Sequence, residues 1–112
     1  MWMLSDIWYS EGFIFEKQTN VFENVYYRHV KTKEGNLTGV IVDYELDDDF
    51  HYELTAENWH LFVEKVLNKS LPETRAFSLF LEKHGLNTTE GVFAFENTLN
   101  DLDIKYKKIA YY

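Results

Sequence analysis

The chain has 112 residues, of which 46% are hydrophobic, and a formal net charge of −8. It is long enough to bury a core without disulfides or metals, and it is too hydrophobic for a disordered chain. Because it contains no cysteine, a disulfide framework, a Cys-ligated zinc site and a thiol nucleophile are excluded.

Nothing in the composition divides the chain, which has one Pro, five Gly and no repeat, so we predict a single domain over residues 1–112. Residues 1–6 lack the basic and apolar regions of a signal peptide. No run approaches the 18 or more apolar residues that a membrane-spanning helix needs. We therefore expect a cytoplasmic protein without a membrane partner.

The first half shows the alternation that is typical of strands. Val40, Val42 and Tyr44 fall on one face of such a strand, and Ile41 and Asp43 fall on the other. Turns are predicted at residues 10–12 and 34–36, which contain Gly12 and Gly35. The predicted strands are residues 7–9, 13–17, 21–33, 37–46 and 50–54.

The second half shows helical spacing. Thr55 is a good N-cap for a helix with Trp59 at the head of its buried stripe. A second helix is expected between Pro72 and Gly85, and a third is expected after a capping box of Asn87 and Glu90. Residues 104–112 read as a last strand. These elements predict an α+β fold, with an antiparallel sheet of about five strands, two to three helices packed on one face, and the C-terminal strand rejoining the sheet.

The negative charge is concentrated in one segment. Residues 34–64 contain nine acidic side chains and no Lys or Arg, whereas the remainder has 11 basic and 10 acidic residues. Such a segment repels a phosphate backbone, so direct nucleic-acid binding is not expected. A basic protein partner is the natural complement, although a charge block can also be a solvated face that maintains solubility.

Aromatic residues are interleaved with these acids, and Tyr and Trp are common anchors of protein interfaces. Tyr44 and Tyr52 could instead belong to the core, and Trp59 is predicted to do so. The predicted partner-binding residues are Asp43, Tyr44, Glu45, Asp47, Asp48, Asp49, His51, Tyr52, Glu53 and Glu57.

No catalytic motif is present. The chain lacks G-x-S-x-G, P-loop and G-x-G-x-x-G patterns, and its four histidines do not have the spacing of a zinc-binding helix. The acids at 47–49 are adjacent, without the spacing of a calcium loop. We therefore predict no catalytic residue, no cofactor and no metal.

Together, the length, the Cys-free acidic composition, the order of elements and the segment from Asp43-Tyr44-Glu45 to Glu57 resemble the small immunity proteins of bacterial polymorphic-toxin and contact-dependent growth inhibition systems. The resemblance implies a chain that binds a cognate toxin, often a basic nuclease, and blocks its active site or substrate groove. Its carboxylates would then take the place of nucleic-acid phosphates.

Two other classes of function fit the sequence. A phage-encoded inhibitor of a host nuclease or defence complex would use the same charges. A small enzyme or ligand-binding domain without a recognisable motif would instead have a deep pocket in which His and carboxylate groups converge. The sequence leaves the partner's identity and the oligomeric state open.

Overall fold

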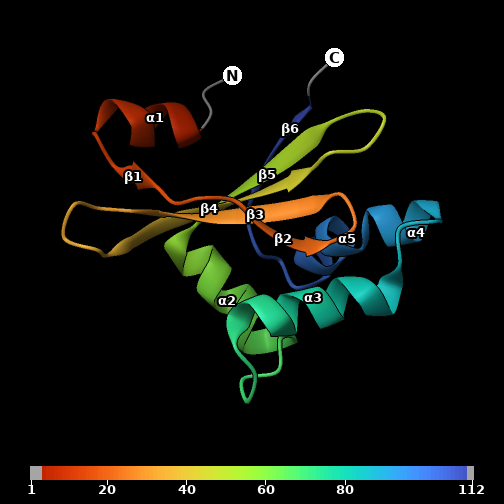
Figure 1. Cartoon of the computed structure of the whole chain (residues 1–112). Coiled ribbons are helices and arrows are strands. Elements are labelled where there is room, and N and C mark those ends of the chain that lie inside the picture. Colours follow the sequence, from red (N-terminus) through yellow and green to blue (C-terminus); the bar gives the residue numbers. More distant parts are fainter. Residues whose placement is uncertain (1–3, 111–112) are drawn as a thin grey trace.

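The computed structural model describes residues 4–110, which form an antiparallel sheet with helices on both of its faces (Figure 1). The sheet order is β1-β3-β4-β5-β6, and β2 also pairs with β3. The strands are β1 (Ile14–Phe15), β2 (Thr19–Phe22), β3 (Val25–Lys31), β4 (Leu37–Tyr44), β5 (Phe50–Thr55) and β6 (Lys107–Ala110). The helices are α1 (Leu4–Ser10), α2 (Ala56–Val66), α3 (Glu73–His84), α4 (Thr89–Val92) and α5 (Ala94–Asp101).

The α+β class, the antiparallel sheet and the return of the C-terminal strand to the sheet are confirmed. The last two residues of that predicted strand, 111 and 112, lie outside the described residues. Six strands are found in residues 4–110. The single strand predicted over residues 21–33 is wrong: a turn at Glu23 and Asn24, where Glu23 has a φ of +42°, divides this segment into β2 and β3. Both β1 and β2 pair with the outer edge of β3. Phe15 pairs with Val30 and Thr19 pairs with Tyr27, so the edge has one residue more than β3 between the two pairings, and this splits it into β1 and β2.

The segment around Trp8 was predicted as a strand, and this is wrong: it is helix α1. Strand alternation would place Ile7 and Tyr9 together on a buried face. In the helix they are 44% and 77% exposed, and Trp8 points inward instead, where it packs with Val30 and Ile41. Tertiary packing has overridden the local preference for a strand. Helices therefore lie on both faces, with α1 on one and α2, α3 and α5 on the other (Figure 1).

The main core lies between the sheet and α2, α3 and α5, and it is aromatic. Trp59, which was predicted to be buried, has no exposed surface. The Phe62 ring meets Phe95 edge to face at 5.0 Å, and the Trp59 ring meets Phe77 in the same way at 5.4 Å. Such pairs add to the stabilisation from area burial. The core thus fixes α2, α3 and α5 against one face of the sheet.

The helix boundaries follow from their caps. The Thr55 hydroxyl accepts from the backbone N–H of Asn58, and Gly85 ends α3 with a φ of +71°. The predicted capping box at Asn87 is displaced by one residue, because Thr88 caps α4 through the N–H of Gly91. The third helix is broken at Phe93 into α4 and α5. Within residues 4–110, no helix is both long enough and apolar enough to span a bilayer.

Candidate protein-binding site

The loop between β4 and β5 carries exposed acids. Glu45, Asp47, Asp48 and Asp49 are all exposed in this five-residue connection, which contains no basic residue. The backbone N–H of Glu45 donates to the carbonyl of Asn24 at 2.8 Å and so joins this loop to the β2–β3 turn. A short connection between two buried strands has no room to turn these side chains inward, so the carboxylates face water.

A shallow groove of about 540 Å³ lies beside this loop. Its lining includes Glu45, Asp47 and Asp48, which we call the rim, and contains no Lys or Arg. Five of the other six lining residues are apolar, and we call these five the floor. We call it the acidic groove, and its lining residues are Asn24, Glu45, Leu46, Asp47, Asp48, Phe50, Leu86, Val92 and Phe93. The arrangement combines a hydrophobic contact area with a negative field, as suits a basic protein segment.

Stacked rings support the floor of the groove. Phe50 stacks on Tyr44 at 5.0 Å and on Phe93 at 5.8 Å, so a residue of β5 and the residue between α4 and α5 are joined in the floor. The ammonium of Lys108 lies 4.5 Å from the centre of the Phe93 ring and 3.0 Å from the Glu96 carboxylate. The charge of Lys108 is thus already paired, and its position holds β6 against the floor.

The place of α4 depends on a close backbone approach. A Cβ atom on Gly91 would lie 2.3 Å from the carbonyl oxygen of Gly85, so only glycine allows α4 to pack this tightly against the end of α3. The adjacent residues Val92 and Phe93 are thereby brought to the groove. Sequence reasoning missed them and Leu86, because they are about 40 residues from the acidic loop and only the tertiary fold unites the two segments.

Four of the predicted partner-binding residues are not on the surface. Tyr44, Tyr52 and Glu53 are 0% exposed and His51 is 2% exposed. The two tyrosines lie on the helix-facing side of their strands, in the main core, where the Tyr52 hydroxyl donates to Glu96 at 2.8 Å. Burial raises the pKa of both hydroxyls. We therefore correct the predicted surface: these four side chains are buried and are not part of it.

Glu53, His51 and Asp43 form a polar network on the opposite face of the sheet. The Glu53 carboxylate accepts hydrogen bonds from the His51 ring at 2.9 Å and from the Leu4 N–H and Ser5 hydroxyl, each at 2.6 Å. Burial alone would raise the pKa of Glu53, but these hydrogen bonds outweigh it and hold the pKa below its ordinary value. The network holds the start of α1 on the sheet.

Asp43 is half-buried beside this network. Its carboxylate accepts from the Gln18 side chain at 2.6 Å and lies 4.0 Å from Nδ1 of His51. Because it lies on the α1 side of β4, it does not belong to the acidic groove. Its role in this structure is to tie the interrupted edge strand to β4.

A second carboxylate, that of Glu73, links two helices to the helix-facing side of the sheet. Glu73, at the start of α3, accepts from the ring of His29 at 2.6 Å, from Nε1 of Trp59 at 3.0 Å and from the Tyr27 hydroxyl at 3.1 Å. Burial acts to raise the pKa of Glu73, but these donors hold it below its ordinary value. Because the donors occupy both carboxylate oxygens, the geometry is that of a structural cross-link between β3, α2 and α3.

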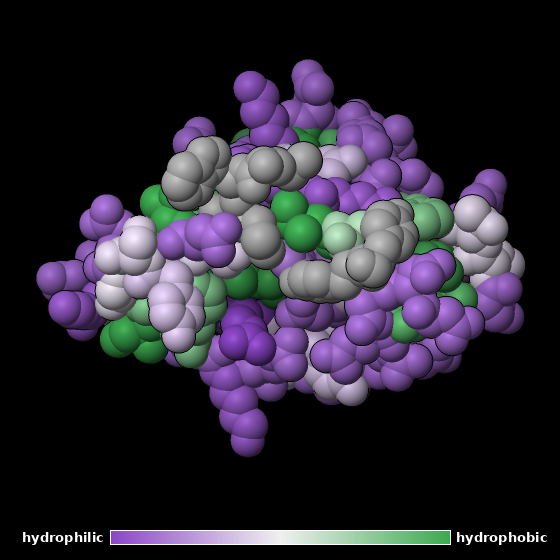
Figure 2. All heavy atoms as spheres, turned by 90° about the horizontal axis from the view of Figure 1, so that it is seen from above, coloured by the Kyte–Doolittle hydropathy of each residue, from purple (hydrophilic) through white to green (hydrophobic). Residues whose placement is uncertain are grey.

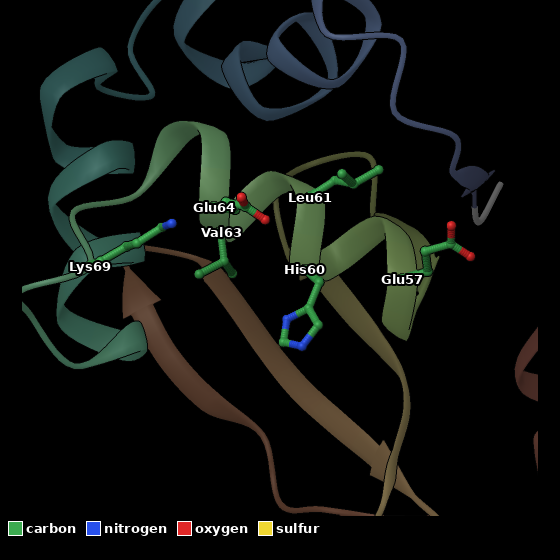
Figure 3. Close-up of a pocket in the computed structure, with 6 residues that line it drawn as sticks. All are labelled: Glu57, His60, Leu61, Val63, Glu64 and Lys69. Carbon is green, nitrogen blue, oxygen red and sulfur yellow. The ribbon is translucent and has the colours of Figure 1, made fainter.

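Glu57 lies far from the acidic groove. It is exposed in the first turn of α2, and the length of β5 (roughly 17–20 Å for a strand of this size) separates it from the acidic loop. Glu57 lines a depression on the outer surface of α2. Figure 3 shows that the side chains around this depression point in different directions and do not converge on one point. The residues that line it are Glu57, His60, Leu61, Val63, Glu64 and Lys69. The ten predicted residues therefore do not form one surface, and the exposed acids at 45 and 47–49 form the coherent part.

Among residues 4–110 no group of three or more His, Asp or Glu side chains is placed to hold a metal ion. Comparison with protein-family models, with curated proteins and with solved structures found no match to this chain.

Proposed function

We propose that this chain is a protein-binding inhibitor, an immunity protein that binds and neutralises a basic toxin, such as a nuclease domain, through the acidic groove. The observation that carries the proposal is the composition of the groove: three carboxylates and five apolar residues line it together, and no lining residue carries a positive charge. In this proposal the chain itself has no catalytic activity.

The two parts of the groove have different roles in binding. The carboxylates attract a basic surface over a distance and disfavour acidic partners, which raises the association rate. The apolar floor supplies the contact that is lost on dissociation. Leu46, Leu86 and Val92 are half-buried, so each still has surface to offer to an apolar side chain of the partner. Bound in this way, the carboxylates would pair with the cationic side chains that a nuclease uses to bind phosphates.

Two charge-matched variants test the proposal. The rim variant carries Glu45→Gln, Asp47→Asn and Asp48→Asn, and the control variant carries Glu34→Gln, Glu57→Gln and Glu64→Gln. All six side chains are exposed, and none makes a hydrogen bond or ion pair within the described part of the chain. Both variants change the net charge equally, so a difference between them reports position.

The assay is capture of partners from the native host with tagged wild-type protein and both variants, followed by inhibition of the purified partner's toxic activity. We expect the wild type and the control variant to capture and inhibit the same basic protein, and the rim variant to do neither. Equal capture by both variants, or a captured protein that is acidic, would refute the role of the groove. A captured protein whose activity is unaffected would refute inhibition while leaving binding intact.

A further inference from the structure

Figure 2 views the molecule from the α1 side of the sheet. This side has another pocket, which differs from the acidic groove because Arg28 and Lys17 line it. Its volume is about 510 Å³, and it lies where the edge strand is interrupted between β1 and β2. Tyr26 and Arg28 reach it from alternate positions of β3, on the face opposite to the helix-facing Tyr27. The lining residues that matter are Phe15, Lys17, Gln18, Asn20, Tyr26 and Arg28.

Three hydrogen-bond donors of this pocket are uncommitted, whereas Gln18 donates to Asp43 and Asn20 donates to the backbone carbonyls of Glu23 and Val25. The half-buried Arg28 guanidinium, the exposed Lys17 ammonium and the half-exposed Tyr26 hydroxyl have no hydrogen-bond or ion-pair partner among residues 4–110. A guanidinium that is partly removed from water and unpaired loses solvation without compensation. It is therefore an unusual feature in a chain with a net charge of −8, where acidic partners are abundant.

The acids close to this pocket are already paired elsewhere. Glu16, which also lines the pocket, lies 3.3 Å from the Lys31 ammonium and 3.6 Å from Nδ1 of His29. Asp43, which is opposite Tyr26 in the β3–β4 register, is bound to Gln18 at 2.6 Å. Lys31 offsets the charge of Glu16, whereas the neutral Gln18 only occupies an oxygen of the Asp43 carboxylate. The cationic groups of the pocket that have no partner are Arg28 and Lys17.

We infer that this pocket binds an oxyanion, a carboxylate or a phosphate, carried on a flat apolar body. The planar fork of Arg28 matches the oxygens of either group in a bidentate manner, and Lys17 and the Tyr26 hydroxyl supply further donors. The rings of Phe15 and Tyr26 provide a wall for the apolar part of the ligand. The site is separate from the acidic groove and does not depend on its proposed function.

Four small probes test the site and distinguish its ligand: inorganic phosphate, acetate, phenyl phosphate and benzoate. Each is titrated into the ¹⁵N-labelled protein at constant ionic strength, and chemical shifts are followed. We expect saturable shifts at Tyr26 and Arg28, and tighter binding of the aromatic probe than of its simple counterpart. Tighter binding of phenyl phosphate than of benzoate identifies a phosphate ligand, and the reverse identifies a carboxylate.

Arg28→Gln should weaken binding of the best probe about tenfold or more, because it removes the charged fork. Arg28→Lys should cause a smaller loss, because charge remains without the bidentate geometry, and it also reports on binding if the Gln variant is poorly folded. The control is Arg75→Gln, which removes the same charge from the exposed surface of α3. Shifts that do not saturate, or equal effects of the Arg28 and Arg75 substitutions, would overturn the inference.

Discussion

Trp59 is the side chain through which the core and the Glu73 cross-link are joined, so its replacement tests the packing of the fold. Its ring contacts Tyr27, Phe62 and Phe77 with centroid separations of 5.4–5.6 Å, and its Nε1–H donates to Glu73. Trp59→Ala removes the ring from a site with no exposed surface. Loss of a buried large aromatic costs about 3–5 kcal/mol, a large part of the roughly 5–15 kcal/mol that stabilises a typical domain.

Trp59→Phe separates the two contributions. It keeps a ring in the core but removes the N–H donor, so one oxygen of the Glu73 carboxylate loses a partner. We expect a cost of about 1 kcal/mol, the usual net value of one protein hydrogen bond, because the Glu73 side chain is 32% exposed and water can bind the freed oxygen. His29 and Tyr27 still bind the other oxygen of Glu73, which keeps this cost below that of the Ala variant.

Urea denaturation followed by far-UV circular dichroism measures both variants without depending on tryptophan fluorescence. Leu79→Ala is the matched control, because Leu79 is a large apolar residue on a helix but is 36% exposed. Its cost should be well below that of Trp59→Ala. An unchanged denaturation midpoint for Trp59→Ala, or a midpoint shift no larger than that of Leu79→Ala, would refute the placement of this residue in the core.

Three further predictions follow from particular contacts. Hydrogen bonds hold the pKa of Glu53 and of Glu73 below the ordinary value of 4.5, so each ionised carboxylate stabilises the fold above that pH and loses this contribution as the pH falls further. The free energy of unfolding of Glu53→Gln and of Glu73→Gln, measured by urea denaturation, should therefore depend less steeply on pH below 4.5 than that of the wild type. Gly39→Ala places a Cβ 2.3 Å from the Trp8 ring and should loosen α1, seen as faster hydrogen exchange of its amides, whereas unchanged exchange would contradict the packing. Gly91→Ala should displace α4 and weaken partner binding with little effect on residues 56–66, as chemical shifts would show, and wild-type affinity would argue against α4 as a wall of the groove.

Much of the fold could be predicted from the sequence because periodicity reports directly on burial. The alternation of Val40, Val42 and Tyr44 and the stripe headed by Trp59 both correspond to residues in the main core. α1 could not be predicted in this way. Seven residues give too little periodicity to separate a helix from a strand, and the outcome depends on a distant hydrophobic surface formed by Val30 and Ile41.

The candidate site was only partly predictable, for a related reason. The charge block at residues 45–49 is visible in the sequence, and its exposure follows from its place between two buried strands. Whether Tyr44 and Tyr52 point outward depends on which face of the sheet the helices cover, which the alternation alone does not say. The contributions of Leu86 and Phe93 depend on the Gly91–Gly85 contact, which has no local sequence signal.

If the acidic groove receives a basic partner, its carboxylates should control how fast the two proteins associate. Stopped-flow rates are measured with the captured partner at several salt concentrations, for the wild type, the rim variant and the control variant. We expect the rim variant to associate more slowly at low salt, with a flatter salt dependence, while the control variant stays close to the wild type. Equal association rates for the rim and control variants at low salt, or binding that strengthens as salt is added, would contradict it.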